Sequence, residues 1–442
     1  MNLPAYVRWC MDRLEAAGYS VYAVGGCVRD WLLGLTPQDF DLCTSALPEQ
    51  MQQVFADREL VLQGVKHGTV GVICPEGVVE ITTYRTEGDY TDSRHPDWVR
   101  FVDRVEEDLA RRDFTVNAMA WSPSRGLQDP FVGAEDLKQG ILRAVGNPQE
   151  RFREDALRIL RGARFAARFR MQPEAQTYEA MIQLAPLMED LARERVWSEL
   201  CKLLLAATDE DLLRYEPIIT QVIPELKPAV GFDQHSRHHA YDLYTHIAHV
   251  TANVPKELSV RWAALLHDVG KPGTFTRDEQ GNGHFYGHAQ EGAKVANQIL
   301  HRLKAPTDLR EQVVTLVEQH MTPLLAQRKV LRRRLSRLGV EPVQRLLELQ
   351  EADMGSKGTG LHPEETEHFH QVRLLIDQLL QEDACLTIRD LAVNGHDLMQ
   401  LGIPAGKELG RCLQSLLDAV LDETIPNAKE PLLEAAKRFR NG

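Results

Sequence analysis

Two aspartates separated by one residue form the strongest candidate for chemistry in this chain. Asp39 and Asp41 flank Phe40. Because successive side chains of a strand point to opposite faces, we expect the two carboxylates to share one face while Phe40 turns into the core. Paired carboxylates suit Mg²⁺, which binds a few carboxylates together with water and substrate phosphates. Such a metal centre would lower the pKa of an attacking hydroxyl and stabilise an in-line displacement, which indicates nucleotidyl transfer.

A glycine-rich turn precedes the aspartates and would bind the phosphates. Residues 21–24 are apolar, which predicts a buried strand, and Gly25 and Gly26 follow it. Without a Cβ, these glycines let backbone N–H groups approach a triphosphate, and Arg29 is placed to bind a phosphate oxygen. A lone Asp-x-Asp is more often a solvated acidic turn, but the glycine-rich turn in front of it favours nucleotidyl transfer.

Glu80 is a candidate third carboxylate. It lies within the β-branched run 78–82, where an unpaired charge would be costly to bury. Two interpretations stay open. Glu80 completes the metal site, or it is an outward-facing residue on a half-exposed strand.

A stripe of charged residues further along the chain is a candidate nucleotide reader. Asp155, Arg158, Arg161 and Arg164 recur at spacings of three or four, which predicts one face of a helix. A carboxylate beside a guanidinium could meet the Watson–Crick edge of a base, and the other arginines could hold phosphates. The alternative is a ladder of salt bridges within the helix.

Other polar groups could contact the nucleotide or RNA. Arg112, Asp113 and Asn117 could distinguish a ribose hydroxyl and bind phosphate. An arginine cluster at residues 332–337 is either an RNA-binding patch or a solvated helical face. The net charge of −13 argues against a protein that coats nucleic acid indiscriminately, so RNA contacts should come from local patches.

The elements that must position these residues change character along the 442-residue chain. Up to about residue 140, strand-like runs at 70–74, 78–83 and 99–102 alternate with short helices, and beyond a turn-rich hinge the pattern is helical. We therefore predict an α+β protein: an N-terminal head with a small mixed sheet, followed by helical parts. The expected domains are 1–140 (catalytic head), 141–230 (nucleotide-selecting neck), 231–362 (a metal-dependent domain) and 363–442 (tail).

The composition favours a cytoplasmic protein. The first residues are charged and amphipathic, and no apolar run is long enough to cross a bilayer, so we expect neither a signal peptide nor a membrane span. Seven cysteines without Cys-x-x-Cys pairs fit a reducing compartment.

The motifs together resemble the class II tRNA nucleotidyltransferases, the CCA-adding enzymes of bacteria, within the polymerase-beta-like superfamily. The matching stretches occur in the family's order and extend into a tail-like segment, at residues 25–30 with Asp39 and Asp41, 111–118, 129–133, 154–161, 193–202, 388–398 and 401–407. The resemblance therefore covers nearly the whole chain.

For the head, the resemblance implies a catalytic metal-binding pair, Asp39 and Asp41. Gly26 and Arg29 would hold the triphosphate and Arg112 would contact the nucleotide. The implied substrates are CTP, ATP and tRNA.

For the neck and tail, the resemblance implies selection without a nucleic-acid template. Asp155 and Arg158 would select C or A, with Arg161 and Arg164 nearby. The tRNA would be held along its acceptor arm and elbow.

Relatives differ in the nucleotides they add. Residues 88–96 resemble a flexible loop that CC-adding relatives lack, which disfavours CC-only addition and leaves A-only addition open. Residues 64–69 differ from the Arg/Lys-rich strand of poly(A) polymerase relatives, a weak argument against that activity. From other classes, a phosphohydrolase with an RNA-binding head and a non-catalytic tRNA-binding module remain; the intact acidic pair disfavours both.

A second candidate metal centre lies in the helical part. Its residues follow the order of HD-type phosphohydrolases: His246, His267, Asp268, His288, His320 and Asp353. Imidazole and carboxylate ligands suit Mn²⁺, Fe²⁺, Ni²⁺ or Mg²⁺. By this resemblance the domain would act on phosphate or 2′,3′-cyclic phosphate ends of damaged tRNA. Other histidines, including His235 and His284, are assigned to the surface or to positions behind the ligands.

Overall fold

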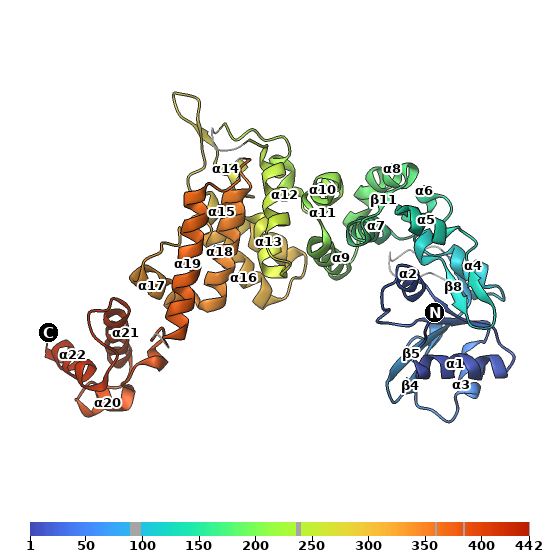
Figure 1. Ribbon diagram of the computed structural model, residues 1–442, viewed down its shortest axis with the longest axis horizontal. Coiled ribbons are helices and arrows are strands. Elements are labelled where there is room, and N and C mark those ends of the chain that lie inside the picture. Colours follow the sequence, from blue (N-terminus) through green and yellow to red (C-terminus); the bar gives the residue numbers. More distant parts are fainter. Residues whose placement is uncertain (89–98, 236–239, 359, 383–384, 442) are drawn as a thin grey trace. The chain divides into compact units, whose positions relative to one another are not determined.

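The computed structural model describes residues 1–88, 99–235, 240–358, 360–382 and 385–441 (Figure 1). The chain forms two compact units, Met1–Pro224 and Glu225–Gly442. The boundary between them lies close to the expected end of the neck. The finer borders near residues 140 and 362 stay predictions.

The first unit contains a seven-stranded sheet in the order β3-β4-β5-β2-β1-β8-β9, so the predicted α+β head is confirmed. The strands of this sheet are β1 Val21–Val24, β2 Leu42–Thr44, β3 Leu60–Val61, β4 Thr69–Cys74, β5 Gly77–Thr83, β8 Ala120–Ser122 and β9 Gly126–Gln128. Two small sheets pair β6 Arg85–Glu87 with β7 Val99–Phe101, and β10 Ile141–Leu142 with β11 Gln172–Pro173.

Helices pack on this sheet, and further helices form the rest of the first unit. Its helices are α1 Ala5–Ala16, α2 Gly26–Leu32, α3 Pro48–Val54, α4 Val105–Ala110, α5 Gly133–Gln139, α6 Pro148–Glu154, α7 Leu157–Phe169, α8 Ala175–Leu184, α9 Arg193–Ala206, α10 Asp209–Arg214 and α11 Glu216–Val222. Helices α1 and α3 pack on strands β1 and β4, and α7 packs along α9. The α7–α9 contact places two parts of the chain, far apart in sequence, beside each other.

The register of three strands gathers the candidate residues of the head. All four residues of β1 are buried, and β1 pairs antiparallel with β2. Strand β2 runs parallel to β5 with Leu42 opposite Ile81, so the residue before β2 and Glu80 lie at neighbouring positions. The backbone N–H of Val24 donates to the carbonyl of Asp41 at 3.0 Å. Asp41 therefore lies beside the end of β1, where Gly25 begins the turn into α2.

The expectation that Asp39, Phe40 and Asp41 form part of a strand is wrong. Strand β2 begins at Leu42, and Phe40 is half-buried rather than in the core. The reason is that β1 ends at Val24, so the residues before Asp41 have no strand to pair with on that side. Both aspartates are solvent-accessible in the segment that leads into β2.

The charged stripe is also less regular than its spacing predicts. Helix α6 ends at Glu154, Asp155 has extended backbone angles, and α7 begins at Leu157. Oδ1 of Asp155 accepts from the backbone N–H of Leu157 at 3.0 Å, a local bond that competes with helix continuation. Asp155 therefore stands at a helix junction, and only Arg158, Arg161 and Arg164 lie on one helix.

The second unit is helical apart from one hairpin. Its elements are α12 Leu243–Asn253, α13 Leu258–Leu266, α14 Lys271–Thr274, β12 Thr276–Arg277, β13 Gly283–His284, α15 His288–Arg302, α16 Thr307–Gln319, α17 Arg328–Leu338, α18 Val340–Gly355, α19 Pro363–Gln381, α20 Gly395–Gln400, α21 Lys407–Leu421 and α22 Lys429–Asn441. Helix α13 packs against α12, α16 and α18, with Trp262 fully buried among them. Across the described part of the chain, every helix is too short or too polar to cross a bilayer.

Most of the arginine cluster on α17 is bound within this unit. Arg332 is buried and pairs with Glu423, and Arg333 pairs with Asp422 at 2.6 Å. Arg328 contacts Glu423 as well. These pairs attach α17 to the end of α21, so this part of the cluster stabilises the fold.

Candidate active site and metal centre

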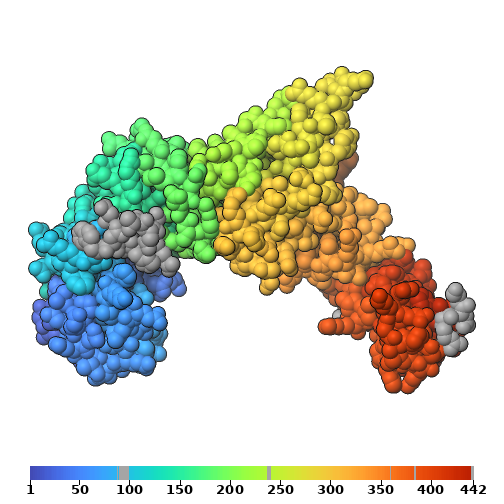
Figure 2. Space-filling model, turned by 180° about the vertical axis from the view of Figure 1, so that it is seen from behind, coloured from blue at the N-terminus to red at the C-terminus, as the bar shows by residue number. Residues whose placement is uncertain are grey.

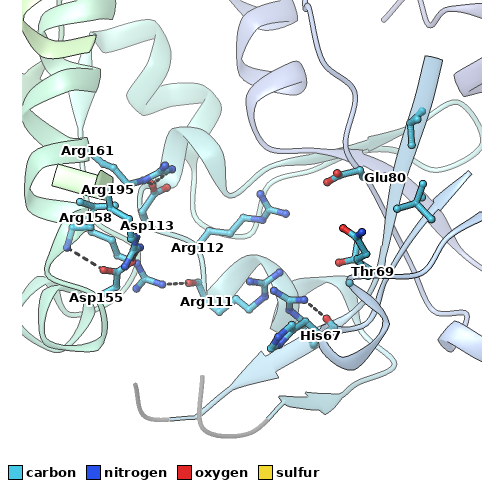
Figure 3. A pocket seen from close by; sticks show the side chains of 17 residues that line it. His67, Thr69, Glu80, Arg111, Arg112, Asp113, Asp155, Arg158, Arg161 and Arg195 are labelled. Carbon is cyan, nitrogen blue, oxygen red and sulfur yellow. Dashed lines mark hydrogen bonds and ion pairs between the residues drawn. The ribbon is translucent and has the colours of Figure 1, made fainter. Parts of the chain in front are cut away.

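A pocket of about 660 Å³ in the first unit collects many of the candidate residues (Figure 3). One wall comes from β4, β5 and the segment before them, and the opposite wall comes from residues 111–113, the α6–α7 junction and α9. The lining side chains include His67, Thr69, Glu80, Arg85, Arg111, Arg112, Asp113, Asp155, Arg158, Arg161 and Arg195. Figure 3 shows Arg112 extending from one wall toward Glu80 on the other.

The acidic residues of the head influence one another. Partial loss of hydration raises the pKa of the Asp41 carboxyl above its ordinary value, and the negative charges of Glu80 and Asp39 add to the shift while Arg112 opposes it. A divalent cation would relieve this repulsion, so the donor set fits Mg²⁺. Within the described residues, Asp39, Asp41 and Glu80 do not each place an oxygen within 4.8 Å of the other two. Whether Glu80 is a ligand stays a prediction.

Position 25 requires a glycine for two reasons, its backbone conformation and the closeness of Arg112. Its φ is +76°, a conformation that L side chains rarely adopt. A Cβ at this position would also lie 2.7 Å from Nη1 of Arg112. The glycine therefore lets the Arg112 guanidinium approach the turn that leads into α2.

Asp155 and Arg158 are held by separate partners. Oδ2 of Asp155 accepts from Nη2 of Arg195 on α9 at 2.8 Å. Nη1 of Arg158 donates to Glu154 at 2.6 Å, and its Nη2 donates to the carbonyl of Arg111 at 3.0 Å. Since each group has its own fixed partners, both present a defined edge to the pocket.

A buried hydrogen-bond network links the glycine turn to α7 through Asp113. Oδ1 of Asp113 accepts from Nδ2 of Asn117 at 3.0 Å, and Oδ2 accepts from Nη2 of Arg161 at 2.6 Å. Burial alone would raise the pKa of Asp113, but Arg161, Asn117 and Arg158 hold it well below its ordinary value. Asp113 is therefore a carboxylate that organises the pocket wall.

Arg29 forms the other end of this network. Its Nη1 donates to Oδ1 of Asn117 at 2.6 Å, its Nε and Nη2 donate to Asp30, and its guanidinium lies 4.3 Å from the centre of the Phe169 ring. Only 7% of its side chain is exposed, and Arg29 is not among the residues that line the pocket. In this arrangement Arg29 supports α2 and Asn117, and its contact with the triphosphate stays a prediction.

Arg164 also has a structural partner. Its Nε lies 2.6 Å from Oε2 of Glu199 on α9, and both side chains are buried. This pair and the pair of Arg195 with Asp155 join α7 and the junction before it to α9.

The loop expected at residues 88–96 lies, except for Gly88, outside the described residues.

The six residues of the second candidate centre come together in the second unit. Nε2 of His267 and Nε2 of His246 lie 3.1 and 3.6 Å from Oδ2 of Asp268. Nε2 of His288 and Nε2 of His320 lie 3.4 and 3.8 Å from Oδ1 of the same carboxylate. Two groups of three potential ligands thus share Asp268.

Asp353 lies beside the first of these groups. Its Oδ1 lies 3.1 Å from Nε2 of His246. All six candidate ligands therefore meet in one place, as the order of the motif predicts.

The tautomers of the histidines favour metal binding. Nδ1 of His267, His288 and His320 lies 2.8, 2.8 and 2.6 Å from a backbone carbonyl, and such a carbonyl accepts a proton from Nδ1. The Nε2 lone pairs then face the centre. Nε2 of His288 and Nε2 of His320 are only 3.2 Å apart, a repulsive arrangement for two lone pairs unless a cation lies between them. The donor set therefore fits a divalent transition metal.

Charge around Asp268 agrees with this view. Burial alone would raise the pKa of Asp268, but His267 and Lys271 hold it well below its ordinary value. Burial and the neighbouring His267 lower the pKa of His320 to about 4, which leaves that imidazole neutral at pH 7. Burial alone would lower the pKa of His267, but Asp268 in turn raises it, so a metal ion that binds there would release the proton of that imidazole, because metals bind the neutral imidazole and the ionised carboxylate.

Some residues of the pocket were given no role by the sequence. Arg195 lies within a stretch that matches the family pattern, but its bond to Asp155 spans 40 positions and no local spacing indicates it. Arg85, Arg111 and His67 also line the pocket. Arg111 adjoins Arg112, and this doublet was the one available signal.

Family models match most of the chain. They describe a poly A polymerase head domain at residues 21–143, a probable RNA and SrmB-binding site of polymerase A at 170–230, and a putative tRNA nucleotidyltransferase domain 2 at 275–436.

Two curated relatives match over almost their full length. The chain is 33% identical over 433 residues to the CCA-adding enzyme of Streptococcus thermophilus, covering 96% of this chain and 94% of that protein. It is 33% identical over 436 residues to the CCA-adding enzyme of Latilactobacillus sakei, covering 97% and 96%. A match to the CCA-adding enzyme of Ligilactobacillus salivarius, at 44% identity over 231 residues, spans 50% of this chain and 57% of that protein.

Two solved structures of CCA-adding enzymes are similar to this chain. The Bacillus stearothermophilus CCA-adding enzyme in complex with CTP superposes with a TM-score of 0.71 at 28% identity, covering 100% of this chain and 99% of the other. The Thermotoga maritima CCA-adding enzyme complexed with tRNA has a TM-score of 0.63 at 20% identity, covering 99% and 96%, and supports the fold alone.

Proposed function

Because this chain belongs to the family of CCA-adding enzymes, we propose that its first unit adds C, C and A to the 3′ end of tRNA from CTP and ATP, with the pocket described above as the nucleotide site. The observation that carries the assignment of residues is the two-sided pocket. Arg112 and Glu80 face each other at one end, and Asp155 and Arg158 are held by separate partners at the other.

The acidic pair would hold the metal. Asp39 and Asp41 are the ligands we assign to Mg²⁺, with Glu80 at the neighbouring position on β5 as a further carboxylate. When bound, Mg²⁺ supplies Lewis-acid activation of the tRNA 3′ hydroxyl and stabilises charge on the phosphates. The chain's own contribution is to fix the triphosphate. The backbone at Gly25 and Gly26 and the guanidinium of Arg112 would hold it beside the carboxylates.

Asp155 and Arg158 would select the base. C4 of cytosine and C6 of adenine each carry an exocyclic amino group on the Watson–Crick edge, whereas the same carbons of uracil and guanine carry a carbonyl oxygen. A carboxylate accepts a hydrogen bond from the amino group and repels the carbonyl. Asp155 can discriminate in this way only if its orientation is fixed, which is the role we assign to Arg195.

The remaining candidate residues would shape the wall of the pocket and support it. Asp113, Asn117 and Arg161 form the network that supports its wall, and Arg29 joins that network from α2. Arg164 attaches α7 to α9 through Glu199. We assign tRNA contacts along the acceptor arm and elbow to the neck and to the tail, where Arg337 and Arg389 line a groove together with Arg333.

Extension assays on tRNA transcripts that end before the first C, before the second C or before the A test this function. With CTP or ATP supplied singly, extension of the shortest transcript by CTP supports complete CCA addition. Extension of only the CC-ended transcript, with ATP, would indicate A-only addition. The Asp39→Ala variant should lose all extension, and persistent extension would contradict the metal assignment.

We also propose that the second unit is a metal-dependent phosphohydrolase. The supporting observation is the cluster of four histidines and two aspartates, with Asp268 shared between two ligand groups. A bound divalent metal would supply a hydrolytic water of lowered pKa. The chain's own residues orient the ligands through backbone carbonyls and exclude bulk water by burial. Its substrates would be tRNA ends that carry a phosphate or a 2′,3′-cyclic phosphate.

The two activities can be separated by substitution. His267→Ala should abolish hydrolysis of a 2′,3′-cyclic phosphate end and leave extension of an intact 3′ hydroxyl unchanged. Asp39→Ala should do the reverse. Hydrolysis that persists in His267→Ala would refute the assignment of this centre.

A further inference from the structure

A hairpin of the second unit leads into the helix that carries His288. Strands β12 and β13 pair antiparallel, with Thr276 opposite His284, and the hairpin is the yellow projection in Figures 1 and 2. Its turn is tied together by Asp278, whose Oδ1 accepts from the backbone N–H groups of Gln280 and Asn282 at 3.0 and 2.8 Å. The hairpin therefore presents its side chains in defined positions.

Two aromatic rings stack at the base of this hairpin. The rings of His284 and Tyr286 are nearly parallel, with an angle of 9° and centroids 5.4 Å apart. Nε2 of His284 lies 3.1 Å from Oδ2 of Asp278, which fixes the imidazole. Tyr286 is 78% exposed, the highest value for a large apolar side chain in the described residues. One face of the tyrosine ring is covered by His284, and the rest of the ring is open to solvent.

The stacked pair lies close along the chain to the residues of the proposed catalytic centre. Tyr286 lies between Phe285, whose carbonyl is 2.8 Å from Nδ1 of the ligand His288, and Gly287, which precedes α15. The Phe285 ring packs 6.5 Å from the His288 ring and 5.3 Å from Nζ of Lys271, the cation that pairs with Asp268. A molecule stacked on Tyr286 would therefore contact a residue that is a near neighbour, along the chain, of the proposed ligand His288.

We propose that Tyr286, supported by His284, is a stacking platform for the 3′-terminal base of the RNA whose phosphate end enters the histidine centre. An exposed aromatic face binds bases of any identity, because every base has a π face, and this suits an enzyme that must accept every tRNA. A platform beside the centre explains why so exposed an aromatic ring stacks on a histidine that Asp278 holds in place. This inference rests on the proposed phosphohydrolase and names the part of the substrate that this site recognises.

Binding and hydrolysis are measured separately to test it. The full-length protein is titrated, with a chelator present, into a short RNA that carries 2-aminopurine as its 3′-terminal base and a 2′,3′-cyclic phosphate. Stacking quenches the 2-aminopurine fluorescence. With Mn²⁺ added, hydrolysis of this RNA is compared with hydrolysis of an RNA whose terminal residue is abasic. The variants are Tyr286→Ala, Tyr286→Phe, which keeps the ring, and Tyr241→Ala, a control tyrosine that is 39% exposed and packs on His249.

We expect Tyr286→Ala to weaken binding and to raise KM for the base-bearing RNA about tenfold with kcat unchanged. The abasic RNA should be hydrolysed equally by all variants, and Tyr286→Phe and Tyr241→Ala should behave like the natural protein. Equal losses on both RNAs, or no loss of quenching in Tyr286→Ala, would overturn the platform. If the natural protein quenched the fluorescence through Tyr286 but hydrolysed neither RNA, the platform would stand as a binding site and the phosphohydrolase proposal would fail.

Discussion

Replacing Arg195 by methionine tests whether the orientation of Asp155 determines which nucleotide is added. Methionine keeps much of the volume and apolar length of the side chain and removes the guanidinium. The bond from Nη2 to Oδ2 of Asp155 is then lost, while Oδ1 still accepts from the backbone of Leu157. The carboxylate loses one of its two anchors and can rotate.

The size of the effect follows from the exposure of the pair. Hydrogen bonds to charged groups contribute about 1.5–3 kcal/mol, and fully exposed ion pairs about 0–1 kcal/mol. Arg195 is 25% exposed and Asp155 is 13% exposed, so the pair lies between these cases. A loss of about 1–2 kcal/mol corresponds to roughly 5- to 30-fold in kcat/KM.

Single-turnover addition of each nucleotide to tRNA transcripts measures this loss. We expect kcat/KM for CTP and ATP to fall by that factor, and the preference for CTP over UTP to fall with it, since a rotated carboxylate no longer repels the carbonyl of uracil. Arg193→Met is the matched control, because Arg193 lies on the same helix and donates to the backbone carbonyl of Glu189.

The reasoning would be refuted by a variant that keeps its preference for CTP over UTP. Equal effects of Arg195→Met and Arg193→Met would also refute it, because both would then act through the stability of α9. Arg195→Lys should recover part of the discrimination, since an ammonium keeps the charge but not the planar geometry.

Three further predictions concern the glycine turn, the buried carboxylate and the second metal centre. Gly25→Ala should lower kcat/KM for CTP more than tenfold, because its Cβ would displace Arg112, whereas Gly18→Ala, at φ +90° with no atom within 4 Å, has similar backbone strain and should keep activity in the same assay. Asp113 has a pKa below its ordinary value. The contribution of its ionised form to the free energy of unfolding is therefore fully present above about pH 4 and is lost as the pH falls further. Asp113→Asn should lower the free energy of unfolding at pH 7 by about 1–3 kcal/mol and flatten its decline between pH 5 and 2, and an unchanged acid slope in denaturant titrations would contradict this. Mn²⁺ at a hundred times its Kd should stabilise the protein by about 2.7 kcal/mol in thermal unfolding, an effect that Asp268→Ala should remove and Asp39→Ala should retain.

Much of the fold follows from local pattern. The apolar runs at β1 and β4 and the β-branched run at β5 are strands, and the loss of strand-like runs after residue 140 marks the change to helices. The junction at Asp155 could not be predicted in this way. Charged residues at helical spacing describe a continuous helix equally well, and only the side-chain bond to Leu157 and the distant Arg195 turn Asp155 out of it.

The two centres differed in how far the sequence could describe them. The six candidate ligands of the histidine centre could be named from their resemblance to an HD-type motif, and the fold brings them together, although the second unit carries many other histidines and carboxylates. Arg29 shows what the local sequence could not describe in the head. A guanidinium after a glycine turn suits a phosphate, and its contacts with Asp30, Asn117 and Phe169 emerge only in the fold. Whether a side chain faces a ligand or supports its neighbours depends on partners that are 88 positions away, as Asn117 is from Arg29.

In both sites, hydrogen-bond partners fix the functional side chains before a ligand binds. In the head, Arg195 holds Asp155 and Glu154 holds Arg158, so the edge offered to a base exists before the base arrives. In the second unit, backbone carbonyls fix the Nδ1 atoms of His267, His288 and His320, so three Nε2 atoms face one carboxylate before a metal arrives. Groups held in this way lose little conformational entropy on binding, and catalysis depends on such prior order. Changes to the supporting partners should therefore alter selectivity and metal affinity more than they alter the stability of the fold.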